Sequence, residues 1–193
     1  MRIIGGRFKG KNLYSVPGAS IRPSGGKLRE AVFDITAGRI ADARVLDLYA
    51  GTGAFGLEAL SRGASRAVMI DSDARAITAI KKNIQLLGVE KRARCIRWDA
   101  SKSINCIQSV HPPFDLVFMD PPYDQEVIYD TLRHLAEART LAADARVVIE
   151  HGIKTPFPDA FPPAFAEADR RKYGKSLVTF LDYVIGKPLY SKL

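Results

Sequence analysis

The sequence has few of the residues that build metal sites or disulfide frameworks. Its 193 residues include two cysteines, Cys95 and Cys106, and three histidines, and no CxxC pair occurs. No histidine lies at ligand spacing from another, so neither a zinc site nor a disulfide scaffold is predicted. A chain of this length buries about 70% of its unfolded surface and needs no such staple. We therefore expect reduced thiols, no metal and a cytoplasmic location.

Long apolar runs are also missing. No stretch approaches the ~18 consecutive apolar residues that a membrane-spanning helix requires. Arg2 and Arg7 are charged where a secretory signal would need an apolar core. Hydrophobic residues make up 47% and charged residues 26%, which is typical of a globular domain and argues against disorder. We expect one domain over residues 1–193, without membrane contact.

Acidic residues are absent from the first 29 positions, and the whole chain carries a net charge of +8. A field of one sign attracts polyanions, although charge alone does not separate nucleic-acid binding from a solvated basic face. We predict that residues 1–25 form a basic extension, a β-hairpin with strands at 2–7 and 11–16 around Gly10. The RNA-binding candidates in it are Arg2, Arg7, Lys9, Lys11 and Arg22.

Strand-like and helix-like segments alternate over residues 26–185. This alternation, with nearly continuous apolar strands, favours an α/β core: a mostly parallel sheet with helices on both faces. Such sheets bind ligands at the carboxyl ends of their strands, and the chain places polar residues there. The predicted strands are 44–48, 66–70, 93–97, 114–119, 146–150 and 177–183, and the predicted helices are 28–35, 54–61, 74–87, 101–108 and 126–135.

The segment Asp47–Gly56 contains a GxGxxG pattern between a strand and a helix. The pattern alone fits a dinucleotide or S-adenosylmethionine. Asp47 would repel a pyrophosphate and attract a sulfonium and an ammonium group. Asp71, 20 residues after Gly51, can accept hydrogen bonds from ribose hydroxyls, unless it serves only as a helix N-cap. The predicted cofactor contacts are Asp47, Ala50, Gly51, Thr52, Gly53, Asp71, Ser72, Asp99 and Ala100, the last two near the adenine.

The turn Asp120-Pro121-Pro122-Tyr123 directly follows an apolar strand. Two prolines stiffen the backbone and leave carbonyls exposed, so a carboxylate and a carbonyl can both accept protons of one exocyclic amine. Such acceptors favour the tetrahedral nitrogen that appears as a methyl group arrives. Tyr123 offers a stacking face for a base that is unpaired or flipped out. We predict that these four residues are catalytic; the alternative is a simple strand-ending turn.

Four separated sequence blocks then resemble the RsmD family of bacterial 16S ribosomal RNA guanine-N2 methyltransferases. These blocks are Met1–Gly10, Arg22–Ser24 with Leu28–Phe33, Gly56–Ala64 and Tyr173-Gly174, in addition to the two motifs above. The resemblance implies a Rossmann-like class I methyltransferase with a seven-stranded sheet, an antiparallel last strand and an extension that helps to hold RNA. It implies S-adenosylmethionine as cofactor, 16S rRNA as substrate and the site residues already named. The chain departs from the family at Ile21, usually Thr, and at Gly25-Gly26, usually a hydroxyl residue followed by Asp.

Three other functions remain open from the sequence. DPPY turns serve any exocyclic amine, so methylation of adenine N6 or cytosine N4 in DNA or RNA is the main alternative. A nicotinamide-dependent oxidoreductase explains the glycine loop but gives Asp47 and Asp120 no role. An RNA-binding or assembly protein without catalysis explains the charge but not the DPPY turn. For the methyltransferase, we expect a monomer acting on a small-subunit assembly intermediate.

Overall fold

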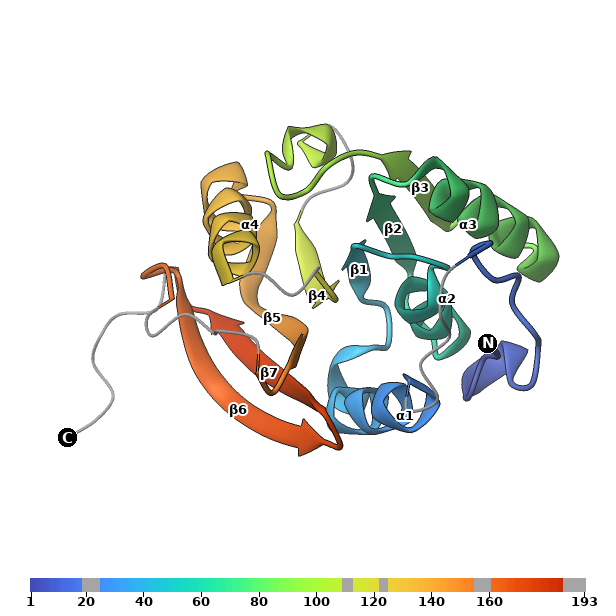
Figure 1. Cartoon of the computed structure of the whole chain (residues 1–193), viewed down its shortest axis with the longest axis horizontal. Helices are drawn as coiled ribbons and strands as arrows, with labels where there is room; N and C mark the ends of the chain where they lie inside the picture. Colours follow the sequence, from blue (N-terminus) through green and yellow to red (C-terminus); the bar gives the residue numbers. More distant parts are fainter. Residues whose placement is uncertain (19–24, 109–112, 122–124, 155–160, 186–193) are drawn as a thin grey trace.

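A mixed, seven-stranded sheet forms the centre of the protein (Figure 1). The computed structural model describes residues 1–18, 25–108, 113–121, 125–154 and 161–185. Strands β1 to β5 run parallel, and β7 is antiparallel to both β5 and β6. The strand order reverses between β1 and β4, where parallel sheets bind their ligands. The spatial order is β3 (Ala93–Arg97), β2 (Arg66–Asp71), β1 (Arg44–Leu48), β4 (Phe114–Met119), β5 (Leu141–Gly152), β7 (Ser176–Tyr183) and β6 (Phe165–Tyr173).

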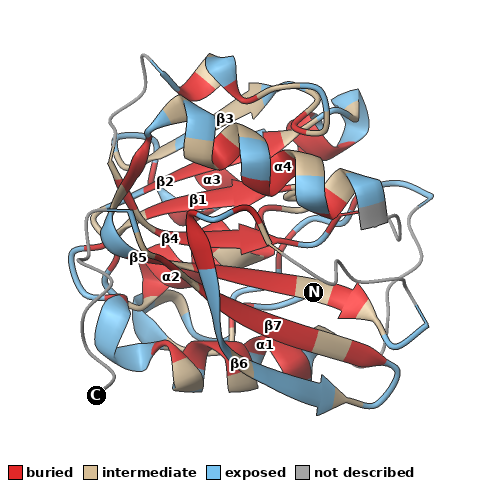
Figure 2. Ribbon diagram, turned by 90° about the vertical axis from the view of Figure 1, so that its left-hand side faces the viewer, coloured by how far each residue is buried: buried red, intermediate tan, exposed pale blue. Residues whose placement is uncertain are grey.

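Helices cover both faces of this sheet, as expected. The helices α1 (Gly25–Ile35), α2 (Ala54–Ser61) and α3 (Ala74–Leu87) pack on one face, and α4 (Gln125–Ala138) packs on the other. Alternate strand residues divide between the two cores, because successive side chains point to opposite faces. Figure 2 shows the resulting layers, with buried central strands and a largely exposed edge strand β6. The predicted α/β class is confirmed, and the last strand of the chain, β7, is antiparallel to both of its neighbours, as the resemblance implies.

Three local predictions were wrong. The helix expected at 101–108 is only a 3₁₀ turn, Asn105–Ile107. The carbonyl oxygen of Ser103, which a helix over this segment would use as an acceptor, accepts a hydrogen bond of 2.9 Å from Nε1 of Trp98 instead. Strand β6 was not predicted, and β5 is longer than the expected 146–150. The other predicted strands and helices are present, with ends that differ by a few residues.

The N-terminal hairpin is the third error. Residues 2–7 and 11–16 meet in one antiparallel bridge, Arg2↔Asn12, and not in two extended strands. A 3₁₀ turn, Gly6–Phe8, interrupts the first segment, and Gly6 adopts a φ of +73°. The Cβ of any other residue at position 6 would lie 2.0 Å from the carbonyl oxygen of Ser61. The close approach of the backbone to α2 therefore replaces the regular pairing of a hairpin.

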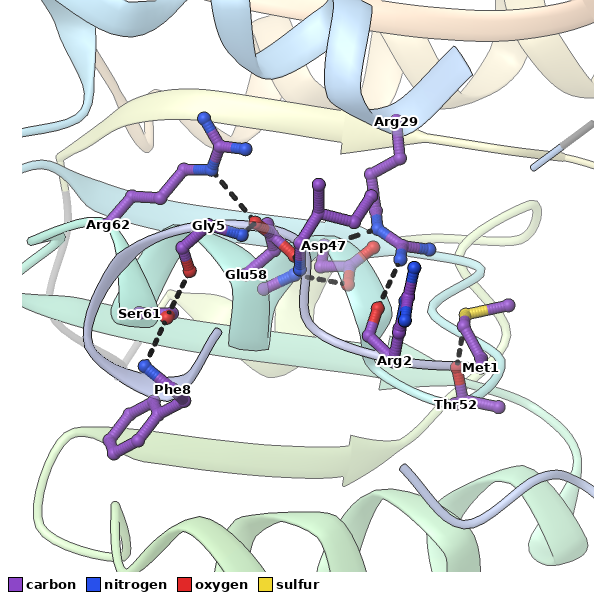
Figure 3. Close-up of polar contacts among 12 residues, drawn as sticks. Met1, Arg2, Gly5, Phe8, Arg29, Asp47, Thr52, Glu58, Ser61 and Arg62 are labelled. Carbon is purple, nitrogen blue, oxygen red and sulfur yellow. Dashed lines mark hydrogen bonds and ion pairs between the residues drawn. The ribbon is translucent and has the colours of Figure 1, made fainter. Parts of the chain in front are cut away.

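Residues 1–18 are packed onto the helices and do not stand apart from them. Glu58 of α2, which is fully buried, accepts hydrogen bonds from the backbone N–H groups of Ile4 and Gly5 at 2.8 and 2.7 Å (Figure 3). Ser61 accepts from the N–H of Phe8 and donates to the carbonyl of Gly5. The blocks Met1–Gly10 and Gly56–Ala64, which are distant in the sequence, thus contact each other directly.

Candidate active site

Carboxylates lie at or near the carboxyl ends of three adjacent strands, on the same face of the sheet. Asp47 lies in β1, Asp120 directly after β4 and Glu150 in β5. All three line one cleft of about 310 Å³ at the carboxyl ends of the strands. Arg29 of α1 and the glycine loop form other parts of its wall. The cleft therefore joins the predicted cofactor loop to the predicted catalytic turn.

Asp47 is a buried acid at the centre of this arrangement. Its side chain is 2% exposed, and its Oδ2 accepts a hydrogen bond of 2.9 Å from the N–H of Gly56. Burial raises the pKa of the Asp47 carboxyl to about 8, the Gly56 N–H lowers it, and the charges of Asp71 and Asp120 raise it again. The carboxyl therefore keeps its proton at neutral pH in the ligand-free protein, and a cationic ligand beside it would favour the ionised form.

The glycines of the loop have different roles. Gly51 has a φ of +55°, and a Cβ at this position would meet no atom within 4 Å, so its backbone is open to a ligand in the cleft. A Cβ at Gly53 or Gly56 would lie 2.8 or 2.9 Å from the side chain of Met69 in β2. These two glycines let α2 pack closely on the sheet. Gly53, although predicted as a cofactor contact, is not part of the described cleft lining.

Asp71 ends β2 beside the glycine loop. Its Oδ2 accepts the N–H of Gly51, and its Oδ1 accepts the N–H of Asp73, both at 2.8 Å. The N-cap of α3 is Asp73, whose side chain accepts from the N–H of Arg75, so Asp71 does not cap this helix. The carboxylate is held rigidly against the loop and retains lone pairs for further hydrogen bonds.

The other predicted cofactor residues lie at the same edge of the sheet. Asp99 follows β3, and its hydrogen bonds with Ser101 hold the pKa of its carboxyl below the usual range. Ala100 is 2% exposed and belongs to the core beneath α4. Ser72 accepts a hydrogen bond from the side chain of Arg97 through its carbonyl oxygen. Within the described ranges, the cleft lining includes Ala50 and Thr52 but none of Ser72, Asp99 and Ala100.

The first two residues of the predicted catalytic turn, Asp120 and Pro121, lie within the described part of the chain. Asp120 is exposed and lines the cleft, and Pro121 is buried. Pro122 and Tyr123 lie outside the described residues, as does Arg22 of the RNA-binding candidates.

Arg29, Tyr49 and Glu150 line the cleft but were not predicted as site residues. Glu150 ends a predicted strand, a signal that already pointed to Asp47 and Asp71. Arg29 is 3% exposed, and it precedes the buried Phe33 by four residues, on one face of α1. Its guanidinium donates to the carbonyl of Arg2 at 2.6 Å, and its Nε lies 3.8 Å from Glu58. The Tyr49 hydroxyl lies 2.7 Å from that of Thr131, and burial raises the pKa of this tyrosine to about 12.

A second cleft, of about 540 Å³, adjoins the first. Arg2 and Lys9 of the predicted RNA-binding set line it together with Lys27. Both clefts share Met1, Gly25 and Arg29 in their walls. Arg7, whose guanidinium lies 5.5 Å from the ring centre of Phe8, and Lys11 are not in the described lining of either cleft. The structure thus brings part of the basic set to the site.

The described part of the chain contains neither a membrane-spanning helix nor a cluster of metal-ligating side chains. No helix there is both long and apolar enough to cross a membrane. Nor do three His, Cys, Asp or Glu side chains gather there as a set of metal ligands.

The strand order, the glycine loop at the reversal point and the acidic strand ends define a Rossmann-like class I methyltransferase. The solved structure of yhhF from Escherichia coli, described as a methyltransferase, is similar with a TM-score of 0.82 and 30% identity, over 95% of this chain and 98% of that one.

The model of a family described as conserved hypothetical protein 95 matches residues 1–182, and the chain belongs to this family, the RsmD family. Ribosomal RNA small subunit methyltransferase D of Escherichia coli is 33% identical over 82% of this chain and 78% of its own length. The protein of the same name in Haemophilus influenzae is 30% identical over 78% of each chain.

Proposed function

We propose that this protein uses S-adenosylmethionine to methylate the exocyclic N2 amine of a guanine in 16S ribosomal RNA. The observation that carries the proposal is the single cleft that Asp120 shares with Asp47 and Gly51. The ribosomal RNA methyltransferases to which the chain is similar support the substrate class. The guanine N2 position is what the resemblance to the RsmD family implies.

The residues present fit this cofactor. The open backbone of Gly51 and the rigid carboxylate of Asp71 suit a nucleoside, whose ribose hydroxyls would donate to Asp71. Asp120, together with Asp47 once a cationic ligand favours its ionised form, would supply negative charge to such a ligand. Asp99 and Ala100 would lie near the adenine, and Ala50, Thr52, Gly53 and Ser72 would complete the surroundings. When bound, the cofactor supplies a methyl group carried on a positively charged sulfur.

Asp120 would hold the amine that receives this methyl group. The amine nitrogen of guanine is a poor nucleophile because its lone pair is delocalised into the ring. A carboxylate that accepts one of its protons, with a carbonyl of the proline turn accepting the other, favours the tetrahedral nitrogen of the transition state. Pro121 fixes φ and removes one backbone donor from this corner. The extra proton of the methylated nitrogen can then pass to Asp120, and Tyr123 would stack on the base.

The second cleft would guide the RNA towards this site. Arg2, Lys9 and Lys27 face a hollow that shares its wall with the cleft of Asp120. Phosphates neutralised there would hold the strand while the target base enters the neighbouring cleft unpaired. Arg7, Lys11 and Arg22 would extend the contact beyond the hollow. We propose that the protein acts as a monomer on a small-subunit assembly intermediate.

Asp120→Asn tests the catalytic assignment. Loss of one preorganised group of this kind costs about 10²–10³ in kcat, and an exposed position tolerates the change with a loss of stability within about 1 kcal/mol. The assay follows methyl transfer to small subunits from a strain that lacks the protein, with mass-spectrometric mapping of the nucleoside. Asp130→Asn on α4 is the matched control, because its carboxylate is exposed beside Arg133. Full turnover by Asp120→Asn, or a product methylated at adenine N6 or cytosine N4, would contradict the proposal.

A further inference from the structure

Glu150 brings a second acid to the end of the cleft where Asp120 lies. The strands β4 and β5 pair in parallel, and Met119↔Ile149 is their last registered pair. Asp120 and Glu150 follow these residues directly, so their Cα atoms lie about one strand spacing, ~5 Å, apart. Phe118 and Val148, two positions earlier, belong to the core beneath α1 to α3. Side chains two residues apart share a face, and both acids indeed line the cleft on that side.

The position of Glu150 is fixed from the neighbouring strand. The hydroxyl of Ser176 in β7 donates a hydrogen bond of 3.1 Å to Oε1 of Glu150. Ser176 is itself 9% exposed, so the contact lies away from bulk solvent. A carboxylate has about four acceptor sites, so a ligand in the cleft can donate to Glu150 without displacing Ser176. Glu150 is therefore a positioned acceptor next to Asp120.

The amine-bearing bases differ in the atom beside their amine. Guanine carries a proton on N1, next to the N2 amine, so its Watson–Crick edge presents adjacent donors. Adenine and cytosine carry an unprotonated ring nitrogen at the corresponding place, and its lone pair accepts hydrogen bonds. Two neighbouring carboxylates thus match the donors of guanine, whereas the second carboxylate would face a lone pair of adenine or cytosine without a proton between them.

We propose that Glu150 accepts a hydrogen bond from N1–H of the target guanine while Asp120 accepts one from its N2 amine, and that this pair of acids selects guanine. The inference rests on the proposed function, because it presupposes methylation at N2. Glu150 remains an acceptor throughout and takes no proton. Sites built to bind a substrate N–H reject analogues that lack it by about 10⁴–10⁵, which is enough to separate guanine from the other amine-bearing bases.

The test compares guanine with 2-aminopurine, which keeps the N2 amine and has no proton on N1. Small subunits are reconstituted with 16S rRNA that carries either base at the nucleotide mapped in the wild-type reaction. Glu150→Gln keeps the size of the side chain and the acceptor for Ser176, and its amide can donate to the bare N1 of 2-aminopurine. We expect the ratio of kcat/KM for guanine over 2-aminopurine to fall by about tenfold to hundredfold, the effect of one hydrogen bond to a charged group.

Glu137→Gln is the matched control, because this residue is exposed on α4 and paired only with Arg133 among the contacts described. It should leave the ratio unchanged. A thermal melt shows whether Glu150→Gln folds as the wild type does. If the wild type does not methylate guanine N2, the proposed function fails. If the wild type methylates guanine N2 but Glu150→Gln has the same ratio of kcat/KM for guanine over 2-aminopurine, the role of Glu150 is refuted and the proposed function stands. An equal loss of activity on both bases counts as an unchanged ratio.

Discussion

Glu58 offers the sharpest test of how the N-terminal segment is held. This carboxylate has no exposed surface, and it accepts two backbone N–H groups, of Ile4 and Gly5, and the Nε of Arg62 at 2.8 Å. Arg29 lies 3.8 Å away (Figure 3). In Glu58→Gln, one oxygen becomes an NH₂ group that faces a donor. Arg29 loses its ion-pair partner, and Arg62 keeps only the more distant Asp34, at 3.8 Å. Hydrogen bonds to charged groups contribute about 1.5–3 kcal/mol each, and breaking a buried ion pair costs about 3–5 kcal/mol.

We therefore expect Glu58→Gln to lower the free energy of unfolding by about 3–5 kcal/mol. Urea denaturation measures this loss, and hydrogen exchange measured by mass spectrometry locates it. The amides of Ile4 and Gly5 should lose protection, because Glu58 is their acceptor. Glu137→Gln is the control for an exposed ion pair and should change stability by less than about 1 kcal/mol. A loss below about 1 kcal/mol in Glu58→Gln, or unchanged protection of the two amides, would refute the reasoning.

Three further predictions concern Asp47, Gly6 and Lys9. Asp47 has its pKa raised to about 8 by burial, so the folded state binds this proton more tightly than the unfolded state and stability falls as pH rises from about 4 to 8. Asp47→Asn should flatten this slope in urea titrations of the ligand-free protein, and an unchanged slope would contradict the assignment. Gly6→Ala should destabilise by about 2 kcal/mol more than Gly10→Ala, since both have a positive φ but only Gly6 abuts Ser61. Lys9→Ala should reduce the slope of the logarithm of the RNA-binding constant against the logarithm of salt concentration by about 1, the contribution of one phosphate contact. Lys91→Ala, in the loop before β3, should leave this slope unchanged. Equal slopes for the two variants would show that Lys9 does not contact phosphate.

The alternation of apolar and polar segments predicted most of the sheet, because the strands β1, β2 and β4 are buried on both faces. Strand β6 escaped prediction for the opposite reason. Only Phe165 at its start is buried, and the later residues are exposed or half-buried and mostly charged, as suits the edge of a sheet. An edge strand with such a sequence has no apolar pattern to detect. Its position depends on pairing with β7, which single-strand periodicity does not reveal.

The candidate site was predictable where a residue follows a strand. Asp47, Gly51 and Asp120 were found by this rule, and the structure gathers them around one cleft. Arg29 was not found, because its place in the cleft depends on how α1 crosses the sheet. The contact between the N-terminal segment and Glu58 could not be predicted from the sequence either. It joins residues more than 50 positions apart, and the sequence showed only two blocks that occur together.

The narrow space between Met69 and the start of α2 links Met69 to Gly56, and neither residue is in the described lining of the cleft. The thioether of Met69 occupies the volume into which a side chain at position 56 would project, and the backbone at Gly56 needs no left-handed conformation. An alanine there is excluded by crowding alone, so a smaller residue at position 69 could admit it. Among related sequences, the bulk of these two positions should therefore covary in opposite directions.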